Sequence, residues 1–216
     1  MDKIERAINK LIAPMLQTAG FNLKKDWGGF FRFTEYGFDE FIVINKGRTE
    51  INYFGIACGV MVRHDRIQKV FNTFGFIDGD EEQKQNPTFV LGYPYDERGL
   101  PNVYFKITPA TMQADIEDIA QKLLQAFHDV AIPFYETYSN LAAVEEKLNT
   151  NPLADIWPYT GGGMLEHRMA NSLLCAKAVN PDRYQLVREA CLNIKGGMYP
   201  KEKHLEIVKR MDELKV

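Results

Sequence analysis

The chain has 216 residues, a formal net charge of −3 and 45% hydrophobic residues, which is typical of a globular protein with a sizeable core. The acidic balance argues against a general nucleic-acid binder, which usually carries a basic stripe. No apolar run approaches the roughly 20 residues that a membrane-spanning helix needs, and the N-terminus lacks the hydrophobic segment of a signal peptide. We therefore expect a soluble protein that binds neither nucleic acid nor membranes.

The three cysteines, Cys58, Cys175 and Cys191, are widely spaced and form no Cys-x-x-Cys pair. This spacing is typical neither of a disulfide framework nor of a zinc site, and it favours a reducing, cytoplasmic compartment. Cys58 and Cys191 fall on apolar faces, and Cys175 flanks one. Because burial raises the pKa of a thiol, we expect core residues here rather than nucleophiles.

Other chemical motifs give no catalytic or metal site. None of the four histidines has another at the four-residue spacing that places two ligands on one helical face. The acidic run 78–86 lacks the alternating oxygen ligands and final glutamate of an EF-hand loop. The sequence contains no Gly-x-Ser-x-Gly elbow, Walker loop or dinucleotide fingerprint. We therefore predict no metal, no cofactor and no catalytic residue.

The N-terminal part combines one helix with a run of strands. Apolar residues at helical spacing predict an amphipathic helix over residues 2–18, in which Pro14 should produce a kink. Glycine-containing turns then separate segments rich in aromatic and β-branched residues, as in an antiparallel meander. The strands are expected at 30–36, 40–45, 51–62, 88–93 and 102–107.

Helical spacing returns after the long strand 51–62. Asp65 and Gln68 fit the capping box of a short helix that Gly75 ends, and the acidic run 78–86 is expected to be a solvated loop. A strong amphipathic helix should begin at Pro109 and end before Pro133. Shorter helices are expected near 141–148 (with a cap near Ser139), 164–178, 181–195 and 200–213.

These elements predict an α+β fold: an antiparallel sheet of about five to six strands with packed helices, followed by a small C-terminal helical segment. Residues 1–150 should form the core domain and residues 164–216 the helical segment. Residues 151–163, with two prolines and three consecutive glycines, are the expected linker.

One face of the strand 51–62 carries the candidate site, because it narrows to three small residues between a tyrosine and a methionine. Two interpretations stay open. A helix over residues 110–130 packs closely against this face, or the face is the floor of a groove for an apolar ligand or a partner's side chain. The end of the strand, where ligands often dock, would form the rim of that groove. The candidate ligand-binding residues are Tyr53, Gly55, Ala57, Gly59, Met61, Arg63 and His64.

Several segments resemble bacterial proteins of the uncharacterised Domain of Unknown Function 4304 family. They are the opening helix with LIAPML, the strands GFFRF, FIVIN and INYFGIACGV, and the later IPFYETYSNLAAVEEKL. The similarity covers residues 3–149, but this chain has Lys46 and Gly47 where family members often have glutamine. The resemblance implies an α+β fold and no catalytic residues. Proteins of this general build include toxin-immunity proteins, which bind and occlude a partner.

We therefore expect a non-catalytic protein-binding module, immunity-like or accessory, with a protein partner. The alternative is a small enzyme or an apolar-ligand-binding domain that uses the groove over Gly55, Ala57 and Gly59.

Overall fold

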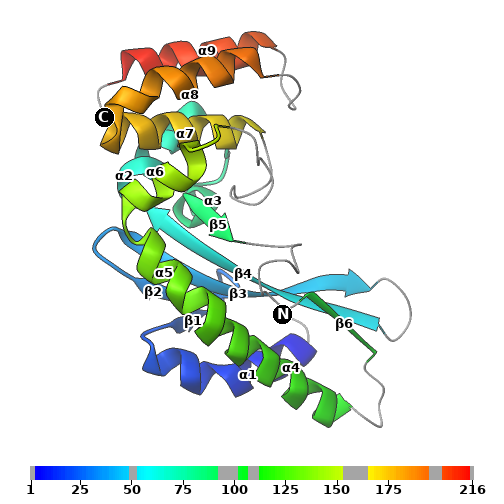
Figure 1. Cartoon of the computed structure of the whole chain (residues 1–216). Coiled ribbons are helices and arrows are strands. Elements are labelled where there is room, and N and C mark those ends of the chain that lie inside the picture. The colour runs from blue at the N-terminus through cyan, green and yellow to red at the C-terminus, as the bar shows by residue number, and fades with distance from the viewer. Residues whose placement is uncertain are drawn as a thin grey trace. The chain divides into compact units, whose positions relative to one another are not determined.

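The computed structural model describes residues 3–48, 53–91, 102–106, 112–152, 165–194 and 201–214, and it confirms the α+β class (Figure 1). The described helices are α1 (Lys3–Thr18), α2 (Asp65–Phe71), α3 (Asp80–Gln85), α4 (Met112–Ala126), α5 (Ile132–Tyr138), α6 (Leu141–Asn149), α7 (Leu165–Val179), α8 (Pro181–Asn193) and α9 (Lys201–Glu213). A 3₁₀ turn, η1 (Asn72–Phe74), and a π-helical segment, η3 (Phe127–Ala131), accompany them. The strands are β1 (Asn22–Lys24), β2 (Gly29–Phe33), β3 (Gly37–Arg48), β4 (Tyr53–His64), β5 (Phe89–Leu91) and β6 (Asn102–Lys106).

Within the described residues the antiparallel sheet has six strands in the order β1-β2-β3-β4-β5, and β6 also pairs with β4. Phe30 lies opposite Phe41 in the β2–β3 pair, and Tyr53 lies opposite Lys106 in the β4–β6 pair. The turn between β1 and β2 depends on Gly28, whose φ of 78° is one that glycine adopts without steric cost. The meander predicted from the turn glycines is thus present.

The chain forms two compact units. The first combines Met1–Met61 with Leu91–Glu136, and the second combines Val62–Val90 with Thr137–Val216. This division differs from the boundary predicted at 151–163, and residues 153–164 lie outside the described part of the chain. Strand β4 and helix α5 each begin in the first unit and end in the second.

In the first unit, α1 packs against α4 and contacts β1 and β3. The helices present apolar residues at the spacing predicted from the sequence, so a buried apolar layer forms between them and one face of the sheet. Phe127 contacts both Phe21 and Phe41, with ring centroids 5.3 Å apart in each pair. The fully buried residues of this layer include Ile8, Ile12, Leu16, Phe21, Phe30, Phe41, Ile119, Leu123 and Phe127.

The long helix does not end before Pro133, contrary to the prediction. It continues through η3 into α5, and Pro133 is the second residue of α5. In a regular α-helix the proline ring would crowd the carbonyl of Asp129 and leave it without a donor. The wider π turn ends one residue before α5's proline, where it relieves this crowding, so the helix continues past Pro133.

In the second unit, α7 is the central helix and contacts α2, α6, α8 and α9. Twelve consecutive residues, Leu165–Ala176, are buried, although several of them are polar or charged. Helices at 165–179, 181–193 and 201–213 agree with the predicted ones to within two residues. Because α7 is buried along most of its length, its polar side chains need hydrogen-bond partners within the second unit.

Two local predictions were wrong. Residues 80–85 form helix α3 rather than a loop. Asp65 is the first residue of α2 and not its cap, because His64 occupies the N-cap position and makes no side-chain cap bond there. The cap predicted near Ser139 is confirmed, since the adjacent Asn140 caps α6 by accepting a hydrogen bond from the Ala142 N–H at 2.9 Å.

Candidate functional site

The predicted groove floor on β4 is covered where the structure describes it. Ala57 is 2% exposed and Gly59 is buried, while Met61 is half-buried. Tyr53 and Gly55 lie on β4, but their surroundings fall outside the described part of the chain. An open floor is therefore not found at Ala57 and Gly59, and the ligand-binding role of this face stays a prediction.

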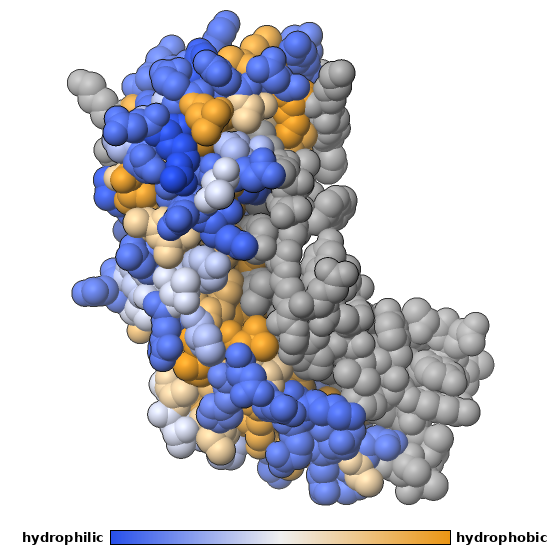
Figure 2. Space-filling view, viewed as in Figure 1, coloured by the Kyte–Doolittle hydropathy of each residue, from blue (hydrophilic) through white to orange (hydrophobic). Residues whose placement is uncertain are grey.

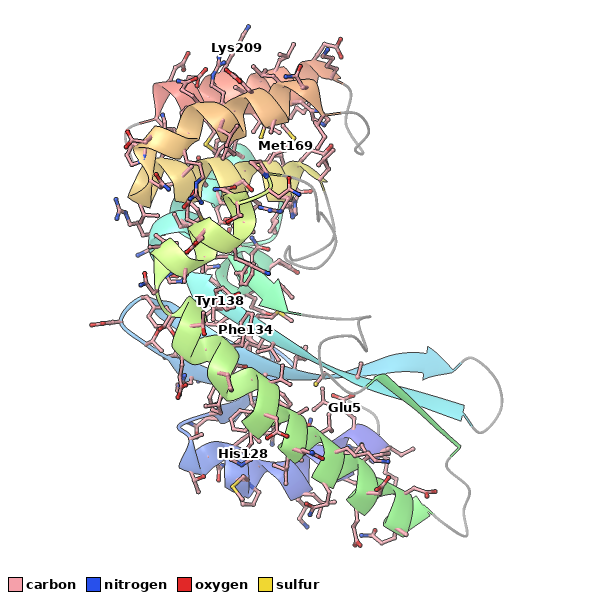
Figure 3. The ribbon with its side chains drawn as sticks, in the orientation of Figure 1. Glu5, His128, Phe134, Tyr138, Met169 and Lys209 are labelled. Carbon is pink, nitrogen blue, oxygen red and sulfur yellow. The ribbon has the colours of Figure 1, made fainter. Side chains whose placement is uncertain are left out.

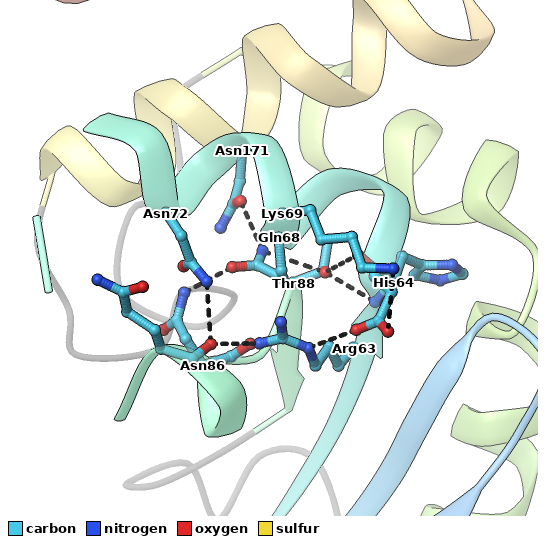
Figure 4. A network of polar contacts seen from close by, with 10 residues as sticks. Arg63, His64, Gln68, Lys69, Asn72, Asn86, Thr88 and Asn171 are labelled. Carbon is cyan, nitrogen blue, oxygen red and sulfur yellow. Dashed lines mark hydrogen bonds and ion pairs between the residues drawn. The ribbon is translucent and has the colours of Figure 1, made fainter. Parts of the chain in front are cut away.

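Arg63 and His64, the predicted rim of the groove, are buried at 5% and 3% exposure. The Arg63 guanidinium donates to a carboxylate oxygen of Asp65 at 2.7 Å and to the carbonyls of Gln83 and Asn86 at 2.8 and 2.7 Å (Figure 4). A buried guanidinium with three oxygen partners fixes the segment around α3 to the end of β4. Its position is that of a structural residue.

A second set of polar contacts surrounds Gln68 on α2. Its side-chain amide donates to Thr88 Oγ1 at 3.1 Å and to Asn171 Oδ1 at 3.0 Å, and its carbonyl accepts from Asn86 Nδ2 at 2.6 Å (Figure 4). These bonds join α2, the segment before β5 and the central helix α7. Sequence reasoning missed this network because a glutamine three residues after an aspartate is also a capping signal.

A pocket of about 420 Å³ lies in the second unit, between the end of α5, helix α6 and helix α7. Tyr138 lies at the C-terminal end of α5 (Figure 3), and its carbonyl accepts a hydrogen bond from Nε2 of His64 at 2.9 Å. Because a carbonyl can only accept, this bond places the proton on Nε2. One predicted site residue thus supports the pocket wall. The lining residues are Thr137, Tyr138, Ala143, Glu146, Lys147, Thr150, Asn151 and Arg168.

Arg168 is the chemically distinctive residue of this pocket, since it lines the wall and is only 1% exposed. Its guanidinium donates to Ser172 Oγ and to the carbonyl of Leu148, both fully buried. These bonds hold the planar group in one orientation. A guanidinium in a medium of low dielectric attracts an anion more strongly than it would in water. Lys147 adds a second positive charge, exposed at the edge of the pocket.

Buried negative charge lies nearby but is already engaged. Glu145 on α6 is 2% exposed and accepts from Asn149 Nδ2 at 3.0 Å and from Arg183 at 3.2 Å. The exposed Glu146 lines the pocket, and its carbonyl accepts from the Thr150 hydroxyl at 2.6 Å. The Thr150 hydroxyl proton is thus already used, and the pocket offers amide and cationic donors together with one exposed carboxylate.

Burial raises the pKa of each cysteine thiol to about 12. All three side chains are buried, which confirms the prediction that Cys58 and Cys191 are core residues and places Cys175 in the core as well. A thiol with so high a pKa is a poor nucleophile at neutral pH. His204 Nε2 lies 2.9 Å from Glu166 Oε1, and His167 packs against the rings of Phe71 and Phe76. In the described ranges, no three His, Cys, Asp or Glu residues are placed to hold a metal ion.

No helix among the described residues has the length and apolar character needed to cross a bilayer. On the face seen in Figure 2, hydrophobic residues form small groups among hydrophilic ones.

Comparisons with known proteins give no assignment. No protein-family model matches the chain. Neither the curated proteins nor the solved structures contain a match. The resemblance to the Domain of Unknown Function 4304 family therefore stays a prediction from short segments.

Proposed function

We propose that this protein is a non-catalytic binding protein that recognises an acidic side chain of a protein partner in the pocket of the second unit. The observation that carries the proposal is the Arg168 guanidinium, which is buried, fixed by Ser172 and Leu148, and part of the pocket wall. A carboxylate is the natural complement of such a group, because the opposite charges attract strongly where water is largely excluded.

The rest of the pocket fits an acidic group. Lys147 supplies long-range attraction from the edge, and the side-chain amide of Asn151 supplies a neutral donor. A volume of about 420 Å³ lies within the range of roughly 300–1,000 Å³ found for specific ligand sites, so it accommodates the acidic residue with part of its flanking chain. Glu146 on the same wall would reject a partner segment with several negative charges on that side.

A binding role is also supported by the state of the nucleophiles and by the family resemblance. The three thiols are buried with raised pKa values, so they are unsuited to covalent catalysis. Their presence as unpaired thiols supports a cytoplasmic location. The resemblance to proteins of immunity-like build favours a role in binding and occluding a partner.

The proposal is tested by titrating the isotopically labelled full chain with the peptide Ac-Gly-Glu-Gly-NH₂ and following backbone amide shifts. The matched probe is Ac-Gly-Gln-Gly-NH₂, which has the same shape without the charge. We expect the glutamate peptide to shift amides of residues 137–151 and around Arg168, and the glutamine peptide to leave them in place.

Lys147→Gln should weaken binding about threefold, which corresponds to roughly 0.6 kcal/mol for an exposed charge. Lys209→Gln, at an exposed position on α9, is the control and should bind as the wild type does. Arg168→Lys should abolish binding, with circular dichroism reporting whether the fold is kept. Equal binding of the two peptides by the wild type would overturn the proposal without any variant.

A further inference from the structure

A row of aromatic rings lies on the opposite face of the sheet in the first unit. Side chains alternate between faces along a strand, so Phe31 and Phe33 on β2 face away from the buried layer that contains Phe30. Trp27 lies against Phe31 with ring centroids 5.0 Å apart, and Phe31 lies 5.1 Å from Phe38 on β3. Phe33 closes the row at 6.2 Å from Phe38, and it is 56% exposed.

The inner end of this row contains a carboxyl group without a partner. Glu40 lies directly opposite Phe31 in the β2–β3 register and is 5% exposed. A side chain at Gly29 would come within 2.8 Å of the Glu40 carboxyl, so the carboxyl rests on the bare backbone of β2. Among the described residues, no group donates a hydrogen bond to this carboxyl and no cation pairs with it.

The neighbouring acid has a different environment. Asp39 points to the other face, where Arg32 donates to it at 2.7 Å and the Tyr36 hydroxyl at 2.6 Å. Arg32 is therefore occupied and does not neutralise Glu40. Burial alone raises the pKa of Glu40 to about 8, so the group is mainly protonated at pH 7.

We propose that the Glu40 carboxylate and the rings of Trp27 and Phe33, the two rings of the row that reach the surface, bind an arginine side chain of a protein partner. A guanidinium is planar, stacks on aromatic faces and forms paired hydrogen bonds with a carboxylate, so it matches both ends of the row. Phe33 and Glu40 are diagonal neighbours in the β2–β3 pair, roughly 7–8 Å apart, a span that an arginine side chain covers. The outer ring already attracts a cation, since Lys24 Nζ lies 5.3 Å from the centre of Phe33.

Arrival of a guanidinium changes the protonation of Glu40. The bound cation favours the charged carboxylate, so the proton held at pH 7 leaves to the solvent as the ion pair forms. Binding should therefore release close to one proton at pH 7 and strengthen as the pH rises toward 8. The site lies wholly within the first unit, so it does not depend on the pocket proposed above.

The test uses the full chain carrying Trp157→Phe, which leaves Trp27 as the fluorescent reporter. The probes are Ac-Gly-Arg-Gly-NH₂ and the same peptide with citrulline, which keeps the shape and removes the charge. We expect the arginine peptide to bind about tenfold more tightly than the citrulline peptide. Calorimetry in phosphate and in Tris at pH 7 should show a buffer-dependent heat that reports the released proton.

Glu40→Gln should remove both the preference for arginine and the proton release, and Phe33→Leu should weaken binding of both peptides. Glu117→Gln, an exposed change on α4, is the control and should bind as the wild type does. Equal binding of the two peptides, or an arginine preference that survives Glu40→Gln, would overturn the proposal. The proton measurement needs only the Trp157→Phe chain, so it tests the proposal even where the Glu40 variant folds poorly. Binding of the arginine peptide without proton release at pH 7 would overturn the proposal.

Discussion

Replacing Gln68 by methionine should destabilise the protein by about 3 kcal/mol. The change keeps the length of the side chain, so it removes three hydrogen bonds without opening a large cavity. Thr88 keeps its bond from the His64 N–H at 2.9 Å, but Asn171 Oδ1 and Asn86 Nδ2 each lose a partner. A polar group left buried without a partner costs roughly 1–3 kcal/mol, and the buried Asn171 together with a smaller cost at the half-buried Asn86 gives the stated value.

The measurement is urea unfolding followed by circular dichroism at 222 nm, repeated as a thermal scan. For a chain of this length, about 3 kcal/mol corresponds to a fall in Tm of roughly 6–12 °C. Gln185→Met, at an exposed position on α8, is the control and should change stability by less than about 0.5 kcal/mol. Adding Asn171→Leu should cost less in the Gln68 variant than in the wild type, because the two side chains share a bond.

A loss of stability of less than about 1 kcal/mol on Gln68→Met would refute the contribution assigned to these hydrogen bonds. Additive effects of the Gln68 and Asn171 changes would refute it as well. Either result would mean that water satisfies these groups in the folded protein, so that the bonds drawn in Figure 4 contribute little.

Three further outcomes follow from single groups. The pKa of Glu40 is about 8 in the folded state and near 4.5 in the unfolded state, so the folded state binds more protons between these pH values. The wild type should therefore lose stability as the pH rises from 4.5 to 8. Glu40→Gln should remove this pH dependence and, in urea unfolding at pH 8, be more stable than the wild type by up to about 4 kcal/mol. Gly75→Ala should cost about 1 kcal/mol in the same assay, because φ is 71° there although no atom lies near an added Cβ, whereas an unchanged stability would show that the turn relaxes. Lys177→Met should lower the free energy of unfolding by about 2 kcal/mol, because the Lys177 ammonium donates to carbonyls at the end of α9. Lys209→Met is the control, and an equal loss of stability in the two variants would show that these hydrogen bonds contribute little.

The parts of the fold that repeat a regular pattern were predictable. The amphipathic helix α1 and the helices α7, α8 and α9 lie within two residues of their predicted bounds, because apolar spacing and glycine or proline boundaries act locally. The continuation of the helix through Pro133 was not predictable, since it depends on a π turn that no residue signal announces.

The candidate sites depended on contacts between distant residues. Arg168 lines the pocket together with residues 137–151, and Glu40 becomes isolated only because Arg32 pairs with Asp39 on the other face. Sequence patterns report which residues are charged, but they do not report which charge finds a partner. His64 was singled out by its position at the end of a strand, and it does contact the pocket wall, although as a buried support.

The passage of β4 and α5 from one unit to the other has a consequence for how such a gene can change. Each unit is assembled from two separate stretches, 1–61 with 91–136 and 62–90 with 137–216. Stopping translation at residue 136 would keep the first unit whole but leave residues 62–90 without α6, α7, α8 and α9. To inherit the second unit alone, a descendant gene needs two junctions, one before residue 62 and one that joins residue 90 to residue 137. Truncation at a single point therefore never yields the second unit whole by itself. Adding the second unit to the first requires two changes, an insertion of residues 62–90 and an extension by residues 137–216.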